Sequence, residues 1–228
     1  MPTIVFVSPK GGAGKTTSAL TLALQLAKRG VRVTVIDADP NYPLAKWSEG
    51  GGCPETLKII SGVTEDNISG KIRDAAAVDP FVIVDLEGTA SKIVVHALQE
   101  ADFVITPMRG SWLDAEQAGR AVALIHDQEL AVQRHVPNYK LPFAILLTCT
   151  PPAYETRNTA SLKKSLLERG IPFFRTEMTE REAFRSMFFF KGPLESLDPK
   201  LVPGINNAVA NAESFAAEVI EKLSEKEG

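Results

Sequence analysis

The sequence has few cysteines and no long apolar run, and both absences narrow the classes of protein that it can encode. Its two cysteines, Cys53 and Cys149, form neither a CxxC pair nor any other spacing typical of a metal site. A reduced cytoplasmic protein is the simplest interpretation. No apolar run approaches the roughly 20 residues that a helix needs to cross a bilayer. We therefore expect neither a disulfide framework nor a membrane-spanning segment.

The chain also lacks a strong excess of charge of either sign. Its 228 residues carry 25 Lys and Arg against 28 Asp and Glu, and the net charge of −3 argues against a constitutive, high-affinity nucleic-acid binder. Met1 leads almost directly into an apolar run, so no signal peptide is expected. The length suits one α/β domain with a well-buried core, and we predict a single domain over residues 1–228.

The most informative segment is a glycine-rich run between an apolar strand-like stretch and a helix-like stretch. It reads Lys-Gly-Gly-Ala-Gly-Lys-Thr-Thr from Lys10 to Thr17, and the apolar residues 4–7 precede it. In this context backbone N–H groups and the positive end of a helix converge on a phosphate. Lys15 is expected to reach the β- and γ-phosphates, and the Thr16 hydroxyl to bind Mg²⁺. The predicted nucleotide-binding set of this loop is Gly11, Gly12, Ala13, Gly14, Lys15, Thr16 and Thr17.

Two later strand-like runs end in carboxylates. Residues 31–36 lead into Asp37 and Asp39, and residues 81–84 lead into Asp85. Ligands bind at the carboxyl edge of open α/β sheets, where all three side chains are expected. A carboxylate there can align water on a terminal phosphate, and Asp85 is the candidate Walker B residue that holds Mg²⁺ through water. For Asp37 and Asp39, the alternative interpretation is an acidic strand end that faces solvent.

Apolar runs alternate with stretches of helical period along the whole chain, which is typical of a parallel sheet covered on both faces. The predicted fold class is α/β, a three-layer α/β/α P-loop NTPase fold with a mostly parallel central sheet. Residues 47–54, with three consecutive glycines, are expected to be a flexible loop. Further strands are predicted at residues 57–60, 103–107, 143–147 and 173–174, and helices at 68–77, 93–99, 114–128, 161–169, 180–189 and 206–223.

Together these motifs resemble those of the ParA/MinD family of ATPases, in its small plasmid-partition ParA branch. The usual P-loop begins with glycine, whereas Pro9 stands there in this chain, and the run from Lys10 is similar to the family's deviant Walker A motif. The resemblance is strong from Thr3 to about Asp114 and weaker beyond. It implies the cofactors ATP/ADP and Mg²⁺, and a slow ATPase that a partner stimulates, since the sequence shows no built-in arginine finger.

The resemblance also implies roles for individual residues. Lys10 would cross a dimer interface to the partner's nucleotide, Asp39 would orient the attacking water, and Asp37 would lie near the Mg²⁺ shell. Asn41 stands where the family often has Gln. Two later segments are similar to base-contacting segments of relatives, although a plain loop explains each as well. The implied catalytic residues are Lys10, Lys15 and Asp39, the metal ligands Thr16, Asp39 and Asp85, and the further cofactor-binding residues Asp37, Pro151 and Met178.

Members of this family bind DNA without sequence preference as dimers, and one segment of this chain suits that role. Residues 151–192 carry eight basic against five acidic residues, a local charge of +3. Dimerisation would double this charge, so ATP would switch on a salt-dependent affinity for DNA. Ordinary solvated helix faces are the alternative for each residue. The candidate DNA-binding residues are Lys163, Lys164, Arg181 and Arg185.

The implied partners are a second copy of the chain, non-specific DNA and a ParB-like adaptor. Residues before Ile4 are too few for the extra DNA-binding domain of larger ParA proteins. The acid-leaning end, residues 224–228, is unlike the basic tail that anchors MinD-like relatives to membranes. We expect no membrane partner and a bacterial cytoplasmic location, with association with the nucleoid in the ATP-bound form.

Other functions of the same scaffold stay open. ATPases that serve conjugative or T-DNA transfer, chemotaxis clusters or cellulose synthesis have similar phosphate sites, and the neighbouring gene would separate them. A nitrogenase-type iron protein needs paired cluster cysteines, which Cys53 in a glycine-rich loop does not provide. A metabolic P-loop ligase would not need Lys10.

Overall fold

The computed structural model describes residues 1–9, 11–88 and 92–225, and within them seven strands form one parallel sheet. Apolar residues fill these strands, as expected for a parallel sheet buried on both faces. The strands are β1 (Thr3–Phe6), β2 (Val33–Ala38), β3 (Leu57–Ile60), β4 (Phe81–Leu86), β5 (Phe103–Arg109), β6 (Phe143–Thr150) and β7 (Met178–Thr179). Their order across the sheet is β3-β2-β4-β1-β5-β6-β7, with every neighbouring pair parallel.

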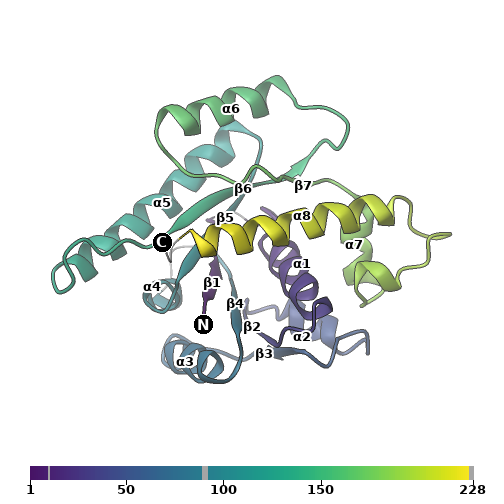
Figure 1. Cartoon of the computed structure of the whole chain (residues 1–228), viewed down its shortest axis with the longest axis horizontal. Helices are drawn as coiled ribbons and strands as arrows, with labels where there is room; N and C mark the ends of the chain where they lie inside the picture. The colour runs from purple at the N-terminus through teal and green to yellow at the C-terminus, as the bar shows by residue number, and fades with distance from the viewer. Residues whose placement is uncertain (10, 89–91, 226–228) are drawn as a thin grey trace.

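Helices cover both faces of the sheet (Figure 1), and alternate strand residues pack against them. In β1, Ile4 and Phe6 join one apolar core whereas Val5 joins the other. The predicted three-layer α/β/α fold is therefore confirmed. The first layer contains α1 (Lys15–Lys28), α2 (Pro43–Ser48), α7 (Glu182–Phe189) and α8 (Ile205–Ser224), and the second contains α3 (Ile68–Val78), α4 (Lys92–Gln99), α5 (Trp112–Gln133) and α6 (Arg157–Glu168).

Helix α8 completes the first layer and fixes the chain between β6 and β7. Its Phe215 is fully buried, and the ring packs edge-on against Phe174 with a centroid distance of 5.5 Å. The buried carboxylate of Glu218 accepts hydrogen bonds from the N–H groups of Arg175 and Thr176, at 2.7 and 2.8 Å. These bonds compensate the carboxylate for its lost water. Helix α8 thus positions the segment that leads into β7.

Two local expectations are wrong. Phe173 contributes only an isolated bridge to Ile145, because the N–H groups of Arg175 and Thr176 that follow donate to Glu218 of α8 and not to β6. The strand beside β6 is β7 instead. The expected loop at 47–54 begins inside α2, since Trp47 is buried and donates its indole N–H to the Met187 carbonyl at 3.0 Å. Among the described helices, none is long and apolar enough to span a bilayer.

We expect Phe215→Ala to lower the free energy of unfolding by about 3–5 kcal/mol, because it removes a fully buried ring and leaves a cavity. Phe189→Ala is the matched control. The Phe189 side chain is 82% exposed, so its loss should change stability by less than about 0.5 kcal/mol. Urea unfolding followed by circular dichroism measures both values, and equal losses would contradict the packing of α8.

Candidate functional site

The carboxyl ends of β2, β4, β1 and β5 meet at one edge of the sheet. From β1 the chain continues through α1 to β2, which lies on one side of β1 in the sheet. From β4 it continues to β5, which lies on the other side of β1. The direction of the connections therefore reverses here, and this edge contains a topological switch point. Such crevices bind ligands in open α/β sheets. The glycine-rich loop follows β1 here, Asp39 follows β2, Asp85 lies near the end of β4, and Arg109 ends β5.

The glycine-rich loop has two of its carbonyl groups tied to the neighbouring strands. The Nε–H of Arg109 donates to the Gly12 carbonyl at 3.1 Å. The hydroxyl of Thr148, in β6, donates to the Ala13 carbonyl at 2.8 Å. A trans peptide directs its C=O and the next N–H to opposite sides, so these bonds turn the N–H groups of Ala13 and Gly14 away from β5 and β6. Neither N–H group has an acceptor among the described residues, and both are available to an anion.

The geometry of the loop requires glycine at two positions. The φ angles of Gly12 and Gly14 are 75° and 86°, in the left-handed region that L side chains rarely adopt. A Cβ atom on Gly14 would also lie 3.3 Å from the Thr148 side chain. Gly14 directly precedes α1, so the positive end of the helix dipole is directed at the loop.

Lys15 is a buried cation in an acidic environment. It is the first residue of α1, and its ammonium donates to the Ser8 carbonyl at 3.3 Å. Burial lowers the pKa of Lys15. The negative charges of Asp85, Asp39 and Glu87 raise the same pKa. A phosphate chain bound here would therefore need a further cation beside Lys15 to offset these carboxylates.

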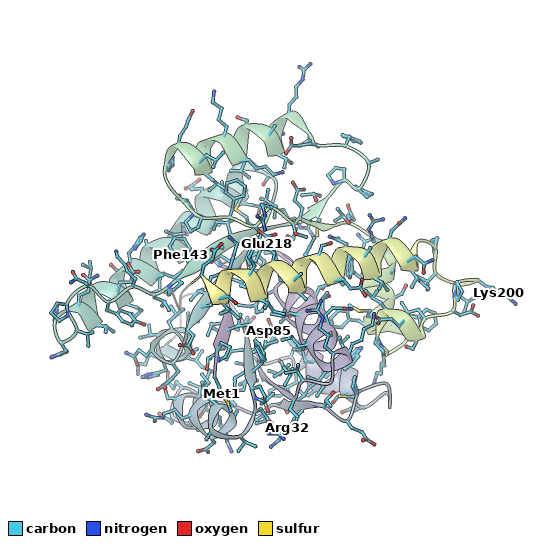
Figure 2. All side chains as sticks on the ribbon, viewed as in Figure 1. Met1, Arg32, Asp85, Phe143, Lys200 and Glu218 are labelled. Atoms are coloured by element: carbon cyan, nitrogen blue, oxygen red, sulfur yellow. The ribbon has the colours of Figure 1, made fainter. Side chains whose placement is uncertain are left out.

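Asp85 is suited to hold that cation. It lies in the interior of the molecule (Figure 2), and burial raises its pKa to about 7 against the opposing effect of the Thr16 hydroxyl. Neither of its oxygens makes a hydrogen bond of normal geometry within the described ranges. Within those ranges no three His, Cys, Asp or Glu side chains gather closely enough to hold a metal ion by themselves. The buried carboxylate of Asp85 and the nearby Thr16 hydroxyl are oxygen ligands, and Mg²⁺ is an ion that binds few protein oxygens and keeps several waters.

Asp37 is committed on one side to protein structure. One oxygen accepts hydrogen bonds from the N–H groups of Leu44 and Ala45, at 2.9 and 3.0 Å, and so holds the start of α2. Burial raises the pKa of Asp37, and these two bonds lower it. The other oxygen has no partner among the described residues, and the β2–β4 register places Asp37 opposite Asp85. Only this second oxygen of Asp37 is therefore available for a contact with a metal ion or with its water ligands.

A cavity of about 430 Å³ brings most of the predicted phosphate and metal residues together. Asp39 lines it, and one carboxylate oxygen of Asp39 accepts the Asn41 N–H at 2.7 Å. Glu87, interpreted from the sequence as a solvated loop charge, is exposed but also lines this cavity. Lys10 lies outside the described residues. The predicted residues that line the cavity are Gly11, Gly12, Gly14, Lys15, Thr16, Thr17 and Asp39.

A second cavity, of about 210 Å³, adjoins the first and shares Gly12, Gly14 and Thr17 with it. Its far wall is formed by the end of β6, by β7 and by the start of α7. Met178 lines this wall as expected, whereas Pro151 does not. The two cavities together form one elongated site with a charged end and a partly apolar end.

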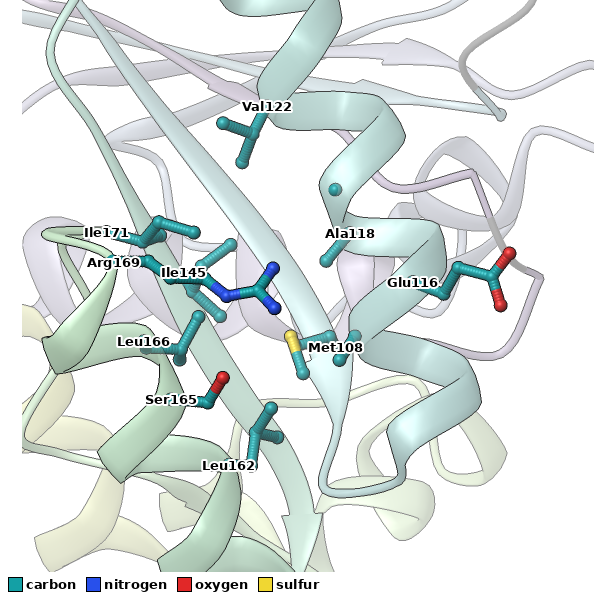
Figure 3. A pocket seen from close by; sticks show the side chains of 12 residues that line it. Met108, Glu116, Ala118, Val122, Ile145, Leu162, Ser165, Leu166, Arg169 and Ile171 are labelled. Carbon is teal, nitrogen blue, oxygen red and sulfur yellow. The ribbon is translucent and has the colours of Figure 1, made fainter.

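A third cavity lies between α5 and α6 and is separate from this site (Figure 3). Its volume is about 260 Å³, and apolar side chains such as Met108 and Leu162 line it. Arg169 extends across it from the end of α6. None of the described residues of the glycine-rich loop, 11–17, contributes to its lining.

The four candidate DNA-binding residues lie on or beside two helices, α6 and α7, which are well separated in Figure 1. Three of them already pair with carboxylates, so their charge is partly compensated within the chain. The fourth, Arg181, precedes α7, and its Nε is buried without an acceptor among the described residues. DNA binding by these side chains stays a prediction. The ion pairs are Lys163 with Glu155 and Glu177, Lys164 with Glu168, and Arg185 with Glu180 and Glu182.

Sequence patterns did not single out Arg109 or the hydroxyl of Thr148, although both hold the glycine-rich loop. Each is a polar residue near the carboxyl end of an apolar strand, and this position is a sequence signal for a ligand-binding edge. The signal points to the glycine-rich loop only when β5 and β6 are known to lie on one side of β1.

Comparisons with known proteins agree with this geometry. A family model described as VirC1 protein matches residues 1–192. The chain is 39% identical to Protein ParA of Rhizobium radiobacter, with 99% of each chain covered. A variant of Cyanothece McdA in complex with ATP has a TM-score of 0.72 at 14% identity, with 98% of this chain and 96% of that chain covered. MinD of Pyrococcus horikoshii OT3 complexed with Mg-ADP has a TM-score of 0.71 at 14% identity, with 96% and 95% covered. These two structures share the fold.

We expect Gly14→Ala to lower the free energy of unfolding by about 1–3 kcal/mol, because it forces a side chain into the left-handed region and against Thr148. Gly11→Ala is the control, since a Cβ there meets no atom within 4 Å and its φ is not left-handed. Its stability should be unchanged or slightly higher. Urea unfolding compares the two, and a larger loss for Gly11→Ala would contradict the described loop.

Proposed function

Because the chain belongs to the VirC1/ParA family of P-loop ATPases, we propose that it is a ParA-type partition ATPase with a deviant Walker A loop. ATP binding assembles a nucleotide-sandwich dimer that binds DNA non-specifically. Hydrolysis stimulated by a ParB-like adaptor resets the dimer, and the cycle segregates or positions plasmid or chromosome DNA. The observation that carries the proposal is the buried carboxylate of Asp85, which has no hydrogen-bond partner of normal geometry, beside Lys15 and a loop of open N–H donors.

The residues of the charged cavity fit a magnesium–nucleotide complex. Lys15 and the N–H groups of the loop hold the phosphates, and Thr16 and Asp85 hold Mg²⁺, Asp85 through water. When bound, Mg²⁺ neutralises phosphate charge and offsets the surrounding carboxylates. Asp39, kept in place by the Asn41 N–H, accepts a hydrogen bond from the attacking water and aligns it, and it is the further candidate ligand of the ion.

Exposed apolar side chains at the same edge of the sheet support a dimer that closes over the nucleotide. Tyr42, Leu113 and Tyr154 follow β2, β5 and β6, and their exposed fractions are 39%, 61% and 68%. Large apolar side chains on two connecting segments and at the start of α5, around one site, suit an interface with a buried apolar centre. In such a dimer, Lys10 would reach from the loop to the partner's nucleotide.

We propose non-specific DNA as the second partner, on the basis of the net positive charge of residues 151–192. Because Lys163 and Arg185 are paired with carboxylates, DNA phosphates would have to compete with these pairs. We therefore expect each protomer to bind DNA with modest affinity. Dimerisation would raise this affinity and salt would lower it. We place the protein in the bacterial cytoplasm and, with ATP bound, on the nucleoid.

A second candidate function is the positioning of another cargo, such as machinery of conjugative or T-DNA transfer, chemotaxis clusters or cellulose synthesis. The same ATP switch would serve any of these cargoes, so the matches to VirC1 and ParA suit both candidates. The neighbouring gene separates the two candidates: a ParB-like gene supports DNA partition, and a secretion or chemotaxis gene supports the second.

Titration calorimetry with Mg-ATP tests the phosphate role of Lys15. We expect Lys15→Gln to weaken ATP binding roughly 10- to 100-fold, the range for a lost hydrogen bond to a charged group. Lys28→Gln, at the other end of α1, is the control, because Lys28 pairs with Glu195 and Glu213 instead. Unchanged ATP affinity in Lys15→Gln would refute the proposed site.

Light scattering with ATP tests the dimer. We expect Lys10→Ala to keep nucleotide binding by the monomer and to lose the ATP-dependent dimer, because the partner's nucleotide would lack one cation. Lys200→Ala is the control, since Lys200 lies in a turn at the right-hand edge of the molecule in Figure 2 and does not line either cavity of the site. If Lys10→Ala dimerises like the wild type, the residue does not act across the interface.

A further inference from the structure

We infer that Arg109 is a further nucleotide-binding residue, whose guanidinium contacts the phosphate nearest the sugar. The inference rests on the proposed function, because it takes the ligand to be an adenine nucleotide. The sheet brings Arg109 to the site: β5 pairs directly with β1, and the Val7 N–H donates to the Ile105 carbonyl at 3.1 Å, just before the glycine-rich loop. The last residue of β5 therefore lies beside that loop.

The guanidinium of Arg109 is oriented but largely unused. An arginine side chain carries five N–H donors, and one of them, on Nε, is bound to the Gly12 carbonyl. Within the described ranges no acceptor lies at bonding distance from its Nη atoms, and no carboxylate pairs with it. Because one bond to the loop already restricts the planar group, little further entropy is lost when the remaining donors bind an anion.

The two adjoining cavities show where that anion would lie. The larger one contains Lys15 and suits a triphosphate, whereas the smaller one is lined by Met178 and Phe184 and suits a base. A nucleotide that spans both would have the phosphate nearest its sugar at the residues that the cavities share. Arg109 lines the smaller cavity together with two of those shared residues, Gly12 and Gly14.

The charge of the smaller cavity also favours an anion. Three basic residues line it, Arg109, Arg181 and Arg185, against a single acidic residue, Glu180. Arg185 is paired with Glu180, and the Nε of Arg181 is buried without an acceptor in the described part of the chain. Arg109 is thus the member of this group that combines a fixed orientation with open donors and no ion pair.

A role limited to holding the Gly12 carbonyl is the competing explanation, and three variants separate it from phosphate binding. Arg109→Gln keeps a donor for the carbonyl but loses the charge, Arg109→Lys keeps the charge, and Arg109→Ala loses both. Arg120→Ala is the matched control, because Arg120 is exposed on α5 and has no ion pair among the described residues. Urea unfolding without nucleotide first shows that each variant is folded.

The readout is the dissociation constant of each variant for ATP, ADP and AMP, measured by calorimetry. All three ligands contain the phosphate nearest the sugar, so we expect Arg109→Ala and Arg109→Gln to weaken all three by a similar factor, roughly 10- to 100-fold. Arg109→Lys should lose less, and Arg120→Ala nothing. Lys15→Gln should instead weaken ATP and ADP far more than AMP. Added guanidinium ion, far below unfolding concentrations, should partly restore binding to Arg109→Ala.

Two outcomes would overturn the inference while the wild type binds ATP. If Arg109→Gln binds all three nucleotides like the wild type, Arg109 only holds the loop. If Arg109→Gln weakens ATP alone, the guanidinium contacts a different phosphate and the assignment is wrong. Failure of the wild type to bind any adenine nucleotide would instead refute the proposed function itself, so the two failures are told apart in the same experiment.

Discussion

The parallel arrangement of the strands is the constraint on which the site depends. Because every strand runs in one direction, the chain must leave each of them at the same edge, and each loop there starts beside its neighbours. The glycine-rich loop can then be held by side chains from β5 and β6, while the carboxylates of β2 and β4 approach it from the other side. One edge of the sheet thus carries donors on one flank and acids on the other.

Two buried carboxylates and one buried ammonium meet at this edge. Asp37 and Asp85 lie opposite each other in neighbouring strands, and both have raised pKa values because they are buried. Lys15 supplies one positive charge against them. In the proposed function, a divalent cation and phosphates would satisfy the unpaired oxygens and the unpaired N–H groups together. The ligand would thereby complete a set of polar groups that the sheet edge holds close to one another.

Much of the fold and of the candidate site could be predicted from the sequence, because local patterns encode them. These patterns are the glycine-rich loop, the strands that end in Asp37 and Asp85, and the alternation of strand and helix. The features that were not predicted depend on contacts between distant segments. Trp47 joins a helix because it reaches Met187, and the edge strand lies at β7 because α8 fixes the preceding segment. Strand order is needed to see Arg109 beside the loop, and tertiary ion pairs are needed to see that Lys163 is compensated.

The bond between Asp37 and the start of α2 has a mechanical consequence. The same short helix carries Trp47, whose indole is anchored to Met187 in α7, and α7 forms part of the wall of the smaller cavity. Helix α2 therefore connects the acidic end of β2 to the opposite end of the site. A displacement of α2 would be transmitted to α7, so the position of one short helix would couple the charged cavity to the smaller one.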